Sequence, residues 1–144
     1  MRTTLAVACL CSLMLAVPGV AGATTWRGKT RQDRAVMVRT GADDLVKRVR
    51  ISWGARCQKK GRYTSTTLFV RPFDAASTTA FEDAGTYHAR VPGGYRARHT
   101  VSVSAVLDGG VWRGSFRVRT RVTRNGRFID SCRLKRVRWS AREA

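Results

Sequence analysis

Residues 111–123 read V-W-R-G-S-F-R-V-R-T-R-V-T, and two kinds of side chain alternate along them with a period of two. Trp112, Phe116 and the valines at 118 and 122 occupy even-numbered positions. Arginines occupy most of the odd-numbered positions between them. Because successive side chains of a strand point to opposite faces of the sheet, this pattern predicts a half-buried strand. One face of that strand enters a core, and the other carries a ladder of guanidinium groups.

The same period of two recurs in residues 49–57, 63–70 and 95–107, and turn residues separate these runs. No long segment shows the period of a helix. Regularly spaced short strands with turns between them are typical of all-β domains. The sequence therefore predicts a single antiparallel β-sandwich, with a small closed or partly open β-barrel as the alternative. The weakest segment is 73–85, for which we expect a loop with one helical turn at 77–82.

Matching the apolar faces of neighbouring runs predicts the hairpin turns, because a slip of one residue would turn every side chain over. Gly109-Gly110 is expected to form a two-residue turn that pairs Leu107 with Trp112. Residues 92–94 are expected to form a three-residue loop.

The dipeptide at 125–126 is Asn-Gly, the usual signature of a two-residue type I′ turn. Such a turn would set Cys132 on the arginine face of the preceding strand. Matching the faces instead predicts a three-residue loop at 124–126, which pairs Cys132 with Val118 and places Phe128 in the core. The apolar phase then slips by one residue near 134–136, and this predicts a β-bulge.

The N-terminus has the features of a signal peptide. Arg2 precedes an apolar run from Leu5 to Val17, and residues 21–23 (A-G-A) match a signal-peptidase site. The run is too short for an ordinary transmembrane helix. We expect cleavage after Ala23, which leaves residues 24–144 as one secreted or cell-envelope domain with no membrane-spanning segment.

Cysteine usage predicts one disulfide. The chain has four cysteines, and Cys9 and Cys11 would leave with the signal peptide. Cys57 and Cys132 remain, and two cysteines in an exported chain favour a single bridge. We expect no metal and no cofactor, because the histidines lack zinc-finger spacing and the paired acids lack the spacing of a calcium loop.

The chain is strongly basic, with 28 lysines and arginines against 9 acids and a formal net charge of +19. A field of this sign attracts anionic partners such as nucleic-acid backbone, acidic glycan or a cell-envelope polymer. The alternative source of the excess is genome composition, because arginine codons are GC-rich. Oligomeric state and natural ligand do not follow from the sequence.

The arginine ladder is the candidate site for an anionic ligand. In the predicted registers Arg98 lies opposite Arg121, and Arg133 lies beside Arg117. Arginine forks bind phosphate and carboxylate groups in a bidentate manner. A solvated arginine face without a ligand remains the alternative interpretation. The predicted binding residues are Arg98, Arg113, Arg117, Arg119, Arg121 and Arg133.

Catalysis has less support in the sequence. A secreted basic nuclease or hydrolase, the rival function, would draw its general acid and base from His88, His99, Asp130, Glu82 and Asp83. No established catalytic motif contains these residues. We therefore expect a non-catalytic binding module, with a purely structural secreted domain as a third option.

Three segments carry a resemblance to a known family. They are W-R-G-K-T-R-Q at 26–32, W-G-A-R-C at 53–57 and S-C-R-L-K-R-V-R-W-S-A-R at 131–142. Together they resemble a secreted bacterial β-domain of actinobacterial type, which has an N-terminal W-x-G-x-T-x-Q segment, two cysteines and a C-terminal W-x-A-R. The G-x-F element of that family appears here as G-T-Y at 85–87. The resemblance implies export, a cysteine pair and a β fold, and it implies no activity.

Overall fold

The computed structural model describes residues 22–59 and 61–144, which form nine antiparallel strands in one sheet. Most of the predicted signal peptide, residues 1–21, lies outside the described residues. The strand order across the sheet is β4-β3-β2-β1-β9-β8-β7-β6-β5. The strands are β1 (Thr25–Thr30), β2 (Ala35–Thr40), β3 (Val46–Cys57), β4 (Arg62–Val70), β5 (Ala75–Ala76), β6 (Ala80–Val91), β7 (Tyr95–Asp108), β8 (Val111–Arg124) and β9 (Arg127–Glu143).

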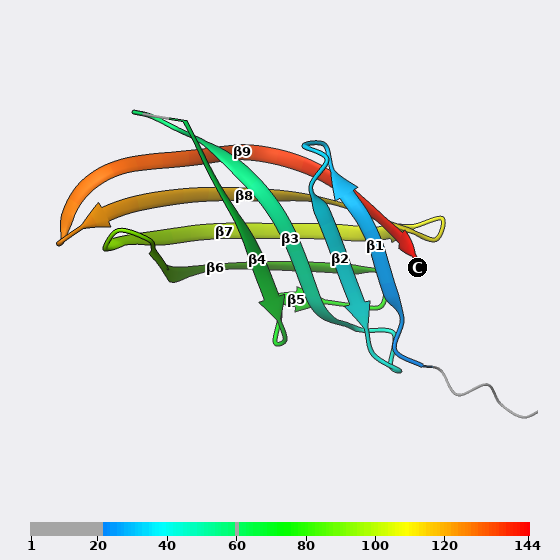
Figure 1. Cartoon of the computed structure of the whole chain (residues 1–144). Helices are drawn as coiled ribbons and strands as arrows, with labels where there is room; N and C mark the ends of the chain where they lie inside the picture. Colours follow the sequence, from blue (N-terminus) through cyan, green and yellow to red (C-terminus); the bar gives the residue numbers. More distant parts are fainter. Residues whose placement is uncertain (1–21, 60) are drawn as a thin grey trace, which may run out of the picture.

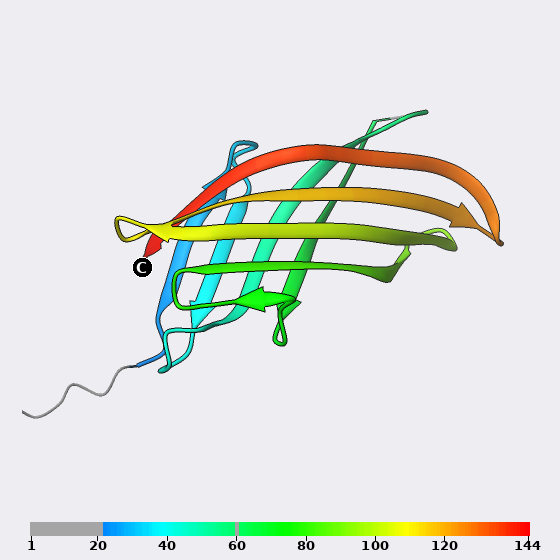
Figure 2. The same cartoon turned by 180° about the vertical axis from the view of Figure 1, so that it is seen from behind.

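The sheet folds back on itself along β9 and makes a two-layered β-sandwich. The β1–β4 layer crosses the β5–β9 layer at a steep angle (Figures 1 and 2). One edge of β9 pairs with β8 along most of its length. Its other edge pairs with β1 near the C-terminus and with β3 at residues 132–133. Within the described residues, no helix is long and apolar enough to cross a membrane.

The core lies between the two layers and is rich in aromatic rings. Trp53 of β3 packs 6.1 Å from Phe116 of β8, and Trp26 of β1 packs 6.4 Å from Trp112, measured between ring centroids. All four tryptophans are buried, with Trp139 the fourth. The alternating residues of 49–57 and 111–123 that were predicted to face inward are therefore the residues that join the two layers.

The β7–β8 and β6–β7 hairpins have the predicted registers. Leu107 pairs with Trp112 across Gly109-Gly110, and both glycines have the positive φ that a type I′ turn requires. Val91 pairs with Tyr95 across the three-residue loop. The predicted bulge is also confirmed, since the β8–β9 register shifts opposite residues 134–137.

The β8–β9 turn differs from the prediction. Arg124 pairs with Arg127, so Asn-Gly at 125–126 forms the two-residue turn after all, with positive φ at both residues. A second register shift between Val122 and Thr123 restores the inward phase, so that Cys132 faces the buried Thr120 rather than Val118. Phe128 precedes this shift and lies on the outer face, where its side chain is 42% exposed.

The segment 73–85 also differs from the prediction. Residues 75–76 form β5, and residues from Ala80 onward form β6 instead of a loop with a helical turn. β6 continues the sheet because it pairs with β7 along its whole length, from Ala80 opposite Val106 to Val91 opposite Tyr95. Long-range pairing thus extends a strand through a segment whose local sequence is small and polar.

Candidate anion-binding surface

The structure places all six predicted arginines on the outer face of the β5–β9 layer, the face seen in Figure 2. Arg98 lies directly opposite Arg121, as predicted. Arg133 lies opposite Arg119 rather than beside Arg117, because the two-residue turn and the register shift change the β8–β9 pairing. Arg113 lies apart from these pairs, toward the β7–β8 turn, where its guanidinium group contacts the Asp108 carboxylate at 3.1 Å.

The most concentrated feature is a line of four arginines, which we call the arginine row. Each member is the register partner of the next, so that the line crosses four neighbouring strands. Thr100 of β7 and Thr86 of β6 continue it with hydroxyl groups that lie 3.4 Å apart. The arginine row consists of Arg62 of β4, Arg56 of β3, Arg133 of β9 and Arg119 of β8.

The disulfide creates this row by joining the two layers. Cys57 of β3 and Cys132 of β9 are bonded and are also register partners. In an antiparallel pair, the residue before one partner lies opposite the residue after the other, which sets Arg56 opposite Arg133. The predicted bridge is confirmed. Sequence reasoning could have used it to extend the site to Arg56, which lies next to Cys57, and through the β3–β4 hairpin to Arg62.

The row has an electrostatic cost. Like charges directly opposite each other on a sheet destabilise it, by roughly 0.2–1 kcal/mol per pair. Four ion pairs occur in the described part of the chain, and none of them involves a member of the arginine row. Each of the four side chains is exposed. A bound polyanion would remove this repulsion.

An aromatic ring lies on the same outer face. The Arg121 guanidinium carbon is 4.8 Å from the centroid of the Phe128 ring, and the Lys59 ammonium is 5.5 Å from it. These cation–π contacts hold two more positive groups beside the arginine row. The prediction that Phe128 lies in the core was therefore wrong.

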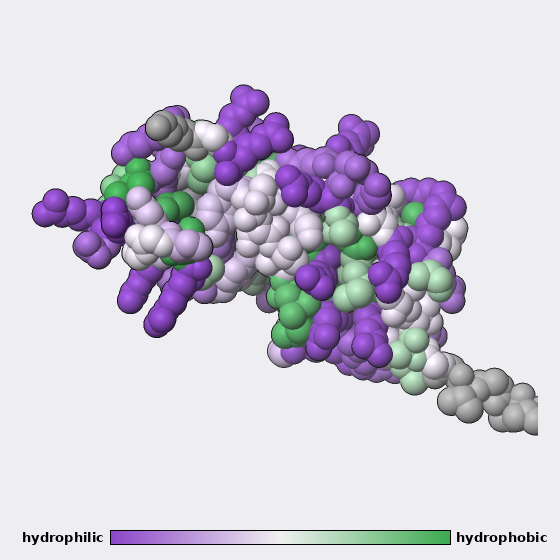
Figure 3. All heavy atoms as spheres, in the orientation of Figure 1, coloured by the Kyte–Doolittle hydropathy of each residue, from purple (hydrophilic) through white to green (hydrophobic). Residues whose placement is uncertain are grey.

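Other arginines are distributed over both layers. Five other pairs of arginines are register partners in the described residues, and hydrophilic side chains project from several sides of the molecule in Figure 3. Each of these pairs spans two strands, whereas the arginine row continues across four strands. The pairs are Arg27–Arg142, Arg39–Arg48, Arg90–Arg96, Arg98–Arg121 and Arg124–Arg127.

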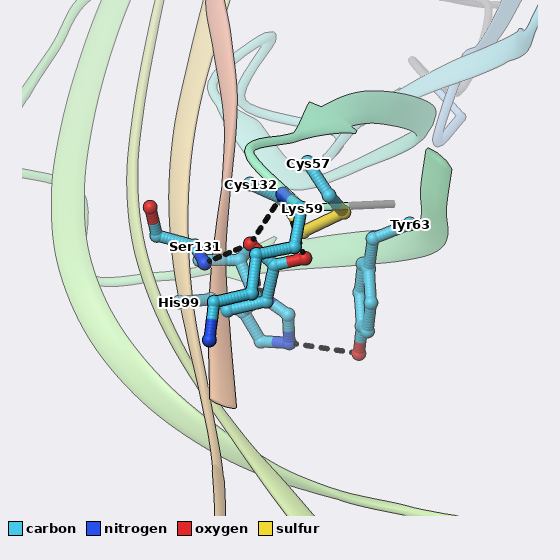
Figure 4. Close-up of a disulfide and its surroundings, with 8 residues drawn as sticks. Cys57, Lys59, Tyr63, His99, Ser131 and Cys132 are labelled. Atoms are coloured by element: carbon cyan, nitrogen blue, oxygen red, sulfur yellow. Dashed lines mark hydrogen bonds between the residues drawn. A yellow bond between two sulfur atoms is a disulfide. The ribbon is translucent and has the colours of Figure 1, made fainter. Parts of the chain in front are cut away.

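The two histidines lie on opposite faces of the sheet. His88 is exposed on the outer face, opposite Arg98. His99 is fully buried beside the disulfide, where its Nε2 lies 3.4 Å from the Tyr63 hydroxyl (Figure 4). Its Nδ1 lies 2.8 Å from the Thr120 hydroxyl. His99 therefore joins β7, β8 and β4 inside the core, as expected for a hydrogen-bonded core histidine.

The candidate carboxylates serve other contacts. Asp130 accepts hydrogen bonds from the backbone N–H groups of Lys59, at 3.1 Å, and Ser131, at 2.7 Å, and so ties the β3–β4 turn to β9. Glu82 and Asp83 lie far along β6 from His88, on the part that pairs with residues 103–104 of β7.

Burial of His99 predicts that stability falls in mild acid. Burial, with a smaller contribution from His88, lowers the pKa of His99 below its ordinary value of 6.5. Below pH 6.5 the unfolded chain therefore binds a proton that the folded chain excludes, so this part of the stability is present above pH 6.5 and is lost as the pH falls. The urea concentration at the unfolding midpoint should decline from about pH 7.5 to about pH 5.0, a range that brackets the ordinary histidine pKa.

The matched variants are H99N and H88N. We expect H99N to be less stable at neutral pH and to show a flatter decline in mild acid, whereas H88N should keep the wild-type decline because its side chain is exposed. An unchanged pH dependence in H99N would show that another group is responsible.

Comparison with protein-family models, with curated proteins and with solved structures finds no match to this chain, so its candidate site is defined by its own geometry.

Proposed function

We propose that this protein is an exported, non-catalytic binding module that holds linear anionic polymers along its outer surface where β4 and β3 of one layer meet β9 and β8 of the other. The N-terminal signal-peptide pattern and the disulfide support export. The single observation that carries the binding function is the arginine row, an unbroken line of four like charges, none of which takes part in the four ion pairs of the described residues.

The geometry favours a polymer over a small anion. Neighbouring strands are spaced about 4.8 Å apart, so the four members of the row extend over about 14 Å. A chain with regularly spaced phosphate, sulfate or carboxylate groups can contact all four arginines at once, whereas one small anion can contact two. The threonine hydroxyls at the end of the row, Thr100 and Thr86, add donors along the same line.

Neutralising the arginine row should weaken binding to anionic polymers and should make the binding constant depend less on salt concentration. In R56Q/R62Q/R119Q/R133Q we expect earlier elution from heparin. We also expect a slope of log K against log salt, for an oligothymidylate, that is smaller by about 3, since each lost phosphate contact removes about 0.7 from the slope for a single strand. Fluorescence anisotropy at several salt concentrations measures this slope.

The matched control removes four positive charges from β1, β2 and the turn between them. R27Q/R31Q/R34Q/R39Q changes the net charge equally but leaves the arginine row intact. It should change the slope by less than about 1. Equal losses in the two quadruple variants would mean that net charge alone attracts the polymer, and the proposed site would then be wrong.

A further inference from the structure

A groove crosses the outer face of the β5–β9 layer beside the arginine row. Its volume is about 740 Å³, and a smaller hollow of about 330 Å³ continues from it toward Arg117. Small residues form the floor, including Ser104 and Ser115, whose hydroxyls lie 3.4 Å apart. Val106, which is 53% exposed, adds an apolar surface. The larger volume is within the range of sites that hold small organic ligands.

The two sides of the groove carry opposite charges. Arg113 of β8 and Arg136 and Arg138 of β9 line one side. Glu82 of β6 lines the other, and Asp74 and Asp83 continue that side into the smaller hollow. Glu82 is thus the acid that lines the groove itself, and Asp74 and Asp83 line only the smaller hollow.

These opposite charges face each other without making contact. None of the four ion pairs in the described residues includes an acid from this groove. Burial and the neighbouring Asp74 carboxylate raise the pKa of Asp83, which shows that the acidic side is itself crowded with like charge. Arg113 is paired with Asp108, but Arg136, Arg138 and Glu82 take part in none of these ion pairs, so a ligand can supply their counter-charges.

The register gives the span between the two sides. Glu82 pairs with Ser104, Ser104 pairs with Ser115, and Ser115 pairs with Arg138, so the four residues form one line across four strands. At about 4.8 Å per strand, the Cα atoms of Glu82 and Arg138 are about 14 Å apart. An extended tripeptide is about 10 Å long, which leaves room for the two charged side chains to reach its ends.

We propose that this groove binds a short extended peptide with free termini. The peptide ammonium group contacts the Glu82 side, the carboxylate is held by Arg136 and Arg138, and small apolar side chains lie over the Ser104–Ser115 floor. Charge complementarity at both ends selects a zwitterion over a polyanion, since a polyanion would meet the repulsion of Glu82 and its neighbours. This peptide site is separate from the arginine row, and it does not rest on the proposed function.

The test uses trialanine and two capped forms of it as probes in NMR titrations of the full protein. We expect trialanine to bind in the millimolar range, and we expect N-acetyl-trialanine and trialanine amide each to bind about tenfold more weakly, because each lacks one terminal charge. The E82Q/D83N variant should bind trialanine more weakly than the wild-type protein but bind N-acetyl-trialanine with unchanged affinity. The R136Q/R138Q variant should bind trialanine more weakly but bind trialanine amide with unchanged affinity.

Two further variants complete the experiment: a matched charge control and a variant whose groove is filled by a larger side chain. R39Q/R48Q removes two positive charges from the other layer and should leave all three affinities unchanged, whereas S104L should abolish binding by occupying the floor. Equal affinities for the three probes would overturn the proposal, as would the absence of shifts with trialanine at about 10 mM. Oligothymidylate binding by the same variants reports on the arginine row separately, so failure here is distinguishable from failure there.

Discussion

The C57S/C132S variant is expected to lose about 4 kcal/mol of unfolding free energy relative to the oxidised protein. The bridge joins residues that are 75 positions apart, and closing a loop of this length restricts the unfolded chain by that amount in the chain-entropy model. Only two register pairs, Arg56–Arg133 and Cys57–Cys132, connect β3 to β9. Besides the bridge, this corner has two other links: the Gln58 N–H donates to the Ser131 carbonyl oxygen at 2.9 Å, and the Lys59 N–H donates to the Asp130 carboxylate at 3.1 Å.

Guanidinium chloride unfolding of the oxidised protein, the reduced protein and the double variant measures the loss. The reduced protein and the double variant should agree, because both lack the cross-link. We also expect the double variant to bind oligothymidylate more weakly, since Arg56 and Arg133 are no longer held side by side. A loss below about 1 kcal/mol would show that the layer contacts alone fix the corner.

Replacing Gly28 with alanine is expected to cost about 3 kcal/mol, at the upper end of what overpacking usually costs. Gly28 of β1 pairs with Ala141 of β9, and an added Cβ would lie 1.8 Å from the backbone oxygen of Ser140. Backbone on the paired strand cannot move aside without breaking the β1–β9 ladder. That ladder is where the sheet passes from one layer to the other.

Gly85 provides the matched control for this substitution. It lies exposed in β6, and an added Cβ would meet nothing within 4 Å. G85A should therefore be neutral or more stable by up to about 1 kcal/mol, since alanine loses less backbone entropy than glycine in a strand. Thermal and urea unfolding of both variants checks the difference, and similar stabilities for G28A and G85A would contradict the close approach of β1 to β9.

The fold class and most inward-facing residues could be predicted because alternation is a property of each strand by itself. Trp53, Trp112 and Phe116 face the core as their period of two required. Hairpins with glycine turns could be matched for the same reason, since both strands and the turn lie next to each other in the sequence, as in Tyr95–Arg124. The Cys57–Cys132 bridge could be predicted because only two cysteines remain after the predicted signal peptide.

Errors arose where two local rules conflicted. At Asn125-Gly126 the turn signature indicated two residues, and face matching indicated three. The protein satisfies both by inserting a register shift next to the turn, which moves Phe128 to the outer face and Arg133 opposite Arg119. At 73–85 the local sequence has little strand character, and only the long β7 provides the partner that makes β6 a strand.

The sequence by itself determined the strands, their two faces, the buried aromatic core and the positive charge. Only the tertiary structure decided which charges become neighbours. Arg56 and Arg62 join Arg119 and Arg133 because the sheet folds along β9 and the disulfide brings β3 to it. The groove between Glu82 and Arg138 likewise requires four strands in one register. The alternation of side chains depends on residues that are close in sequence, whereas the lateral order of strands depends on contacts between residues far apart in the chain.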